Sequence, residues 1–235
     1  MYPTTTATLP PPTPPPPDRS GRRWTRRLLT AGALAGPLFV AAFLVEGATR
    51  PHYDPVRHPV SSLALGGGGW VQQVAFVFGG LLSLALALGL RRALRGQPAA
   101  TWGPLLVAVW GLGLIGAGLF LTDPVSGYPP GTPDRSDHHT VHGALHDVAS
   151  LVGFVALTAA CFAFSRAFAR RGRRGWAAYS AASGIGFPAA LVLASAAFAQ
   201  NAALVGVGGL VQRAMVVIGW SWLTLLALRT RRDLR

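Results

Sequence analysis

The chain has few charged residues and a single cysteine. Charged side chains make up 12% of its 235 residues, whereas hydrophobic side chains make up 51%. That leaves too little polar surface for an ordinary soluble globular protein. Cys161 has no second cysteine, so the chain forms no internal disulfide and cannot hold a metal on several thiolates. We expect Cys161 to be a packing residue in a membrane protein.

Lysine is absent and acidic residues are scarce, with 8 Asp and Glu against 21 basic residues, all of them Arg. The formal net charge of +13 is a value also found in nucleic-acid-binding proteins. Most of the Arg residues, however, lie in short clusters beside long apolar runs. This distribution is typical of membrane topology, so we expect no nucleic-acid partner.

Six apolar runs are long enough to cross a bilayer, whose hydrocarbon core of about 30 Å needs roughly 20 residues of helix. The sequence therefore predicts an all-α, polytopic membrane protein with a six-transmembrane-helix bundle. We expect the first span to be retained, because a long segment precedes it and no convincing signal-peptide cleavage pattern follows it. The predicted spans are Leu28 to Val45, Trp70 to Leu90, Trp102 to Leu121, Val148 to Phe164 with a helical lead-in from His142, Trp176 to Ala199, and Ala203 to Leu228.

The Arg clusters predict the orientation. They occupy residues 19–27, 91–95, 166–174 and 229–235, and cytoplasmic segments carry such an excess of positive charge. We expect both termini in the cytoplasm and a location in a bacterial-type inner membrane. Three parts follow: residues 1–27 are a disordered Pro/Arg-rich cytoplasmic tail, residues 28–229 are the transmembrane domain, and residues 230–235 are a basic cytoplasmic tail.

Glycine and tryptophan give expectations about packing. Glycines within the spans, such as those of residues 111–118, allow helices to approach closely. Several tryptophans lie near the ends of the predicted spans, where an indole ring suits the headgroup layer. They are Trp70, Trp102, Trp176, Trp220 and Trp222.

On this topology all 6 His residues and most acidic residues lie on or near the outer face. Two outer loops carry them, and both are long enough to fold over the mouth of the bundle. The sequence therefore predicts an outer-facing polar pocket, with Glu46, Asp54, Arg57, His58 and Arg213 as candidate ligand-binding residues. The second loop and the helix after it add Asp123, Tyr128, Asp134, Asp137, His138, His139, His142, His146 and Asp147.

A divalent metal such as zinc is one hypothesis for this face. His142 and His146 are four residues apart and share a helical face, and Asp147 follows directly. His139 joins that face if the helix begins early. Two imidazoles with one carboxylate suit zinc with an open position for water. The pattern lacks the Glu of the familiar metalloprotease motif, so it is not specific.

A serine nucleophile is a second hypothesis. Ser61 or Ser62 would attack, with His146 as the base and Asp123 as the orienting carboxylate. In a third interpretation these side chains only bond to one another and hold the loops over the helices. The sequence leaves open whether the protein is an enzyme.

Arg213 lies well inside the sixth span, where a charge is costly and normally faces the bundle interior with a partner. We expect Glu46 or Asp123 to be that partner. The alternative is that Arg213 binds an anionic headgroup.

Several of these segments together resemble the domain of unknown function 998 family. They are residues 54–66, Asp123-Pro124, the stretch from His142 to Asp147, and the Gln212-Arg213 pair. That family is in turn distantly similar to the Frag1/DRAM/Sfk1 group of six-helix membrane proteins, some of them linked with lipid handling. The resemblance implies the six-helix fold and no settled activity.

The sequence thus favours an integral membrane protein whose outer pocket handles a lipid or envelope molecule, with the lipid bilayer as its one certain partner. A metal-assisted or serine-type hydrolase is one alternative. A structural or partner-binding membrane subunit is another. Neither the ligand nor the oligomeric state follows from the sequence.

Overall fold

The computed structural model describes residues 19–97, 100–135 and 139–234. These ranges contain no β-strand, and six of their helices are long and apolar enough to cross a membrane, which confirms the predicted all-α fold. The expected Pro-rich tail up to residue 18 lies outside the described residues. The α-helices are α1 (Arg19–Thr49), α2 (Trp70–Ala93), α3 (Trp102–Leu119), α4 (Val141–Arg170), α5 (Arg174–Phe198) and α6 (Gly208–Arg232), with short 3-10 helices η1 (Val60–Ala64) and η2 (Val205–Val207).

Helix α1 begins earlier than the predicted span. Residues 19–27, which the sequence assigned to a disordered tail, form its first turns. The helix has 31 residues, so at 1.5 Å per residue it is about 46 Å long, which exceeds the bilayer core of about 30 Å. A helix of this length leaves room for its basic first turns outside the hydrocarbon.

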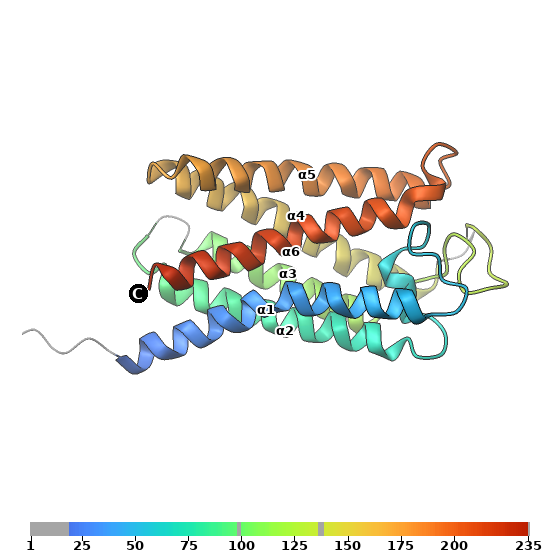
Figure 1. The fold of residues 1–235 in the computed structure, drawn as a ribbon, viewed down its shortest axis with the longest axis horizontal. Helices are drawn as coiled ribbons and strands as arrows, with labels where there is room; N and C mark the ends of the chain where they lie inside the picture. Colours follow the sequence, from blue (N-terminus) through green and yellow to red (C-terminus); the bar gives the residue numbers. More distant parts are fainter. Residues whose placement is uncertain (1–18, 98–99, 136–138, 235) are drawn as a thin grey trace, which may run out of the picture.

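The six α-helices form a closed ring. Each packs against its neighbours in the chain, and α6 returns to pack against α1 (Figure 1). The start of α1 and the end of α6 lie at the same end of the bundle. We call it the arginine end, because the described parts of the four Arg clusters lie there. The opposite end, here the loop end, carries the segments 50–69, 120–135, 139–140 and 199–207.

Glycines allow the helices of the ring to touch through their backbones. A Cβ atom on Gly80 would lie 2.6 Å from the backbone oxygen of Gly111, and one on Gly113 would lie 2.7 Å from that of Ala149. No side chain fits at such distances, so α2, α3 and α4 depend on glycine at these crossings. The expectation of tight packing through glycine is confirmed.

The five tryptophans predicted at span ends differ in burial, and Trp176, near the start of α5, is partly buried. Trp70 and Trp102 lie at helix ends and are 66% and 67% exposed, as expected of rings in the headgroup layer. Trp220 and Trp222 are buried near the middle of α6, so that prediction was wrong for them. The predicted span was 203–228, whereas the helix is 208–232. The centre of the helix therefore lies closer to these two rings than the centre of the predicted span does. The indole N–H of Trp222 donates to the hydroxyl of Ser180 at 3.1 Å.

The α1–α2 segment, residues 50–69, docks on the start of α6. The N–H of Gly209 donates to the carbonyl oxygen of Arg57 at 3.1 Å, and the side-chain oxygen of Gln212 accepts from the N–H of Val60 at 2.7 Å. Backbone groups that a helix start leaves unpaired are thereby satisfied. A Cβ atom on Gly209 would collide with the carbonyl oxygen of His58, so glycine is required at this contact.

Arg213 fastens the same segment from inside the bundle. Its buried guanidinium donates to the carbonyl oxygens of Pro55 and His58 and, at 2.7 Å, to the hydroxyl of Tyr53. Its Cζ atom also lies 5.6 Å from the centre of the Phe43 ring. All the acceptors are neutral, and two of them are backbone atoms of the docked segment.

The expectation that Arg213 pairs with Glu46 or Asp123 was therefore wrong. Glu46 forms its ion pair with Arg50, four residues later and just past the end of α1, at 2.7 Å. Asp123 instead accepts from Thr140 at the start of α4. The guanidinium of Arg213 therefore donates to carbonyl oxygens of the α1–α2 segment instead of to a carboxylate. Arg213 is an anchor for the segment that covers this side of the bundle.

Replacing Arg213 with leucine should destabilise the loop end. The substitution removes every side-chain donor of Arg213 and leaves buried acceptors unpaired, which we expect to cost about 3 kcal/mol of unfolding free energy. Arg232→Leu removes the same charge from an exposed site at the arginine end and should cost less than about 0.5 kcal/mol. Thermal unfolding in detergent and protease cleavage within residues 50–69 measure the two effects. Equal melting temperatures and equal cleavage would contradict the anchoring role.

Candidate functional site

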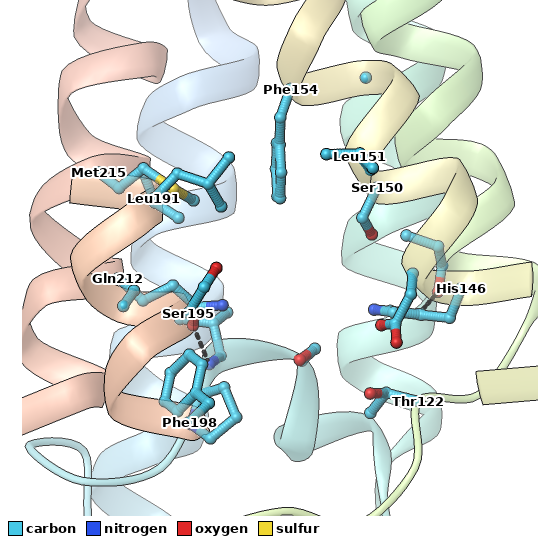
Figure 2. Close-up of a pocket in the computed structure, with 18 of the residues that line it drawn as sticks. Thr122, His146, Ser150, Leu151, Phe154, Leu191, Ser195, Phe198, Gln212 and Met215 are labelled. Atoms are coloured by element: carbon cyan, nitrogen blue, oxygen red, sulfur yellow. Dashed lines mark hydrogen bonds between the residues drawn. The ribbon is translucent and has the colours of Figure 1, made fainter. Parts of the chain in front are cut away.

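A cavity of about 520 Å³ lies inside the ring at the loop end (Figure 2). Sites for small molecules usually measure roughly 300–1,000 Å³. Every helix of the ring contributes to its walls, and so does the docked α1–α2 segment through Pro59, Val60 and Ser61. Arg213 and Gln212, which dock the α1–α2 segment on α6, thus also determine the position of one wall of this cavity.

The polar lining residues lie in the outer part of the cavity, where apolar ones such as Phe198 also lie, and its inner part is apolar (Figure 2). The polar ones come from the loops and from turns near the loop end, whereas the aromatic floor comes mainly from positions well inside the helices. The result is a polar mouth above an apolar floor. The mouth contains Ser61, Thr122, Asp123, Arg135, His139, His146, Asp147, Ser150, Ser195 and Gln212, and the floor contains Phe39, Trp110, Phe154 and Trp220.

The cavity wall reaches the lipid-facing surface beside α4. Leu151 lines the cavity and is itself 55% exposed. Val148, Val152 and Val155 on the same helix are exposed too, and an exposed apolar helix surface of this kind contacts acyl chains in a membrane. The cavity therefore borders both the loop end and the region of the lipid chains.

His146 is the one buried polar residue among the described residues of the mouth. Its Nδ1 atom lies 2.9 Å from the carbonyl oxygen of Ala117 and 3.0 Å from that of Phe120. Carbonyl oxygens only accept, so Nδ1 carries a proton, and in the neutral ring Nε2 then keeps a free lone pair. One ring nitrogen thus satisfies the carbonyls at the end of α3. The other has no hydrogen-bond partner in the described part of the chain.

Asp123 fixes the start of α4 at the mouth. Its carboxylate accepts from the N–H of Thr140 at 3.0 Å and from the hydroxyl of Thr140 at 2.6 Å. Thr140 in turn caps the helix by accepting from the N–H of Gly143 at 2.9 Å. A Cβ atom on Gly143 would collide with the carboxylate. A negative charge at a helix N-terminus is stabilised by the helix dipole. The main structural role of Asp123 is therefore to hold the N-terminus of α4.

The two loops do meet at one site. Ser61 from the first loop and Asp123 and His139 from the second line the cavity together with His146 and Asp147 of α4. The remaining sequence candidates lie elsewhere. Ser62 is fully buried away from the cavity, and its hydroxyl has no partner in the described part of the chain. The others that do not line it are Glu46, Asp54, Arg57, His58, His142 and Arg213.

Asp54, Arg57 and His58 organise the loops. The Asp54 carboxylate accepts from the N–H of Val56 at 2.8 Å, and Arg57 donates to Asp134 at 2.7 Å, which joins the two loops. The Nδ1 atom of His58 accepts from the N–H of Asp54 at 2.9 Å. Burial lowers the pKa of His58 by disfavouring the charged ring, which keeps Nδ1 available as an acceptor.

Within the described ranges no three His, Cys, Asp or Glu residues gather to hold a metal. His146 directs Nδ1 to backbone oxygens, and the exposed His142 packs its ring against Phe120 with 5.8 Å between the ring centres. Asp137 and His138 lie outside the described residues. The metal hypothesis for His142, His146 and Asp147 stays a prediction.

Five polar residues of the mouth were not candidate site residues from the sequence, namely Thr122, Arg135, Ser150, Ser195 and Gln212. Ser150 had a usable signal, because it lies four residues after His146 and so on the same face of α4. Ser195 lies near the loop end of α5, among small residues that do not stand out by composition. Figure 2 shows Ser150 and Ser195 on opposite walls of the cavity.

Comparison with known proteins gives the family. Searches of curated proteins and of solved structures gave no match. A family model described as a protein of unknown function (DUF998) matches residues 33–229. That range includes the loops at both ends of the bundle and every residue that lines the cavity. The chain is a multi-pass membrane protein that belongs to the DUF998 family.

Proposed function

We propose that the cavity at the loop end binds one amphipathic molecule, a membrane lipid or a lipid-linked envelope molecule. The observation that carries the proposal is the polar mouth and the apolar floor within one cavity. A lipid has the same two parts in the same order along the membrane normal. The exposed Leu151 marks a side by which a chain enters from the bilayer.

The mouth favours a head that offers hydrogen-bond donors. Asp147 brings a carboxylate, since that of Asp123 already accepts from Thr140, and Arg135 brings the one guanidinium among the described lining residues. His146 adds a free acceptor at Nε2. Hydroxyl or amine groups suit this set better than a multiply charged anion does. An apolar chain would lie against the aromatic floor, where each buried methylene contributes about 0.8 kcal/mol.

We also propose that the loop end faces the outside and the arginine end the cytoplasm, as the Arg clusters predict. Reporter fusions test the orientation. A reporter placed after Arg95 or Arg174 should be active in the cytoplasm, and one inserted near Gly66 or Arg135 should be active outside. Outside activity after Arg174 would reverse the assignment.

Filling the cavity should abolish binding. Ser150 projects into it (Figure 2), so Ser150→Trp places an indole where the chain or head would lie. The control is Val152→Trp, which adds the same side chain on the same helix at a residue that is 50% exposed and does not line the cavity. We expect Ser150→Trp to weaken binding of a fluorescent lysophosphatidylethanolamine at least about tenfold.

Val152→Trp should bind as the unmodified protein does. Melting temperatures of the two variants show whether each is folded. If Ser150→Trp is folded and binds normally, the cavity is not the binding site.

Hydrolysis of the bound molecule is a second candidate function. Ser61 lines the same cavity as His146, whose Nδ1 bond leaves Nε2 free to take a proton. In that case a fluorophosphonate should label Ser61, and Ser61→Ala and His146→Gln should each remove the label. Ser150→Ala, also in the mouth, should keep it. A folded protein that is not labelled would exclude a serine nucleophile and leave binding alone.

A further inference from the structure

A second cavity lies at the arginine end, remote from the first. Its volume is about 290 Å³, and its walls come from the ends of α2, α4 and α6 and from the α4–α5 connection. Phe164, Phe168 and Leu226 line its inner part. Arg171, Arg173 and Arg229 also line it. Three guanidinium groups thus share one concave site.

These guanidinium groups are only partly paired. Arg229 approaches Asp233, the one acidic lining residue in the described chain, with 3.3 Å between Nε and Oδ2. Arg171 donates one N–H to the neutral side chain of Gln97. Arg173 makes no side-chain hydrogen bond or ion pair with any described residue. Three positive charges therefore face one negative charge, and most of their donors remain free.

The backbone adds to the positive potential. Arg173 is the residue before the first turn of α5, and no side chain caps the N–H groups of that turn. An uncapped helix N-terminus carries a partial positive charge. Other Arg pairs at this end, such as Arg91 and Arg92, are exposed on α2 and do not line this cavity. The general excess of Arg does not account for three of them around one hollow.

We propose that this second cavity binds a phosphate group. Guanidinium groups bind phosphate oxygens through paired N–H donors, and three of them match the charge and the several oxygens of one phosphate. The phosphate is either that of an anionic phospholipid head, with its glycerol end toward the apolar inner wall, or that of a soluble ion. The proposal does not depend on what the first cavity binds.

The test compares two double variants that each remove two charges from exposed positions at the same end. Arg171→Gln/Arg173→Gln changes the cavity, and Arg91→Gln/Arg92→Gln is the control. The whole protein, in a neutral detergent that provides no charged bilayer surface, is titrated with phosphatidylglycerol and, separately, with inorganic phosphate. Native mass spectrometry counts bound lipid, and the melting temperature reports binding of either probe.

We expect the cavity variant to bind one of the probes at least about tenfold more weakly, and the control variant to change by less than about threefold. Selective loss for phosphatidylglycerol alone identifies a lipid head, and selective loss for inorganic phosphate identifies a soluble ligand. If the unmodified protein binds neither probe, or if both variants lose equally, the proposal is overturned. Equal melting temperatures of the probe-free variants show that loss of folding is not the cause.

Discussion

A buried guanidinium holds the loop end of this protein together. Arg213 reaches from α6 into the α1–α2 segment and donates to the carbonyl oxygens of Pro55 and His58, which would otherwise lose this partner. The same segment supplies Pro59, Val60 and Ser61 to the cavity wall. The position of that wall, and with it the shape of the mouth, therefore depends on one side chain that does not line the cavity.

The neutral partners of Arg213 explain why a charge is tolerated there. An ion pair at this depth requires two charged groups to leave water, whereas carbonyl oxygens and the Tyr53 hydroxyl require only one. Donation to several dipoles spreads the positive charge, and the rings of Phe43 and Tyr53 lie beside it. Glu46 remains free for Arg50, which itself donates to the carbonyl oxygen of Leu63 at 3.1 Å. Two arginines thus hold one segment, by different chemistry.

The membrane spans could be predicted from the sequence because a bilayer imposes a minimum length on apolar helices. Apolar runs of that length can be read directly from the sequence. The convergence of the α1–α2 and α3–α4 loops could also be predicted, since both return to the same end of the ring. The partners of Arg213 could not be predicted, because every residue has a carbonyl oxygen and no residue type marks the ones that bind it. Ser61 and Ser62 are adjacent, and only the 3-10 turn decides that Ser61 lines the cavity while Ser62 is buried.

The mouth also shows how structural and functional roles divide among its polar atoms. Asp123 is committed to Thr140, and Nδ1 of His146 is committed to the end of α3. Among the described residues of the mouth, the unpaired atoms include Nε2 of His146, with Asp147 beside it, and the hydroxyls of Ser61, Ser150 and Ser195. A ligand competes only for atoms that the protein does not already use, because displacing Asp123 or Nδ1 would free a helix end. The acceptors available to a ligand are therefore few and fixed in direction, and they lie above an apolar floor. Such an arrangement selects a molecule by where its donors lie relative to its chain.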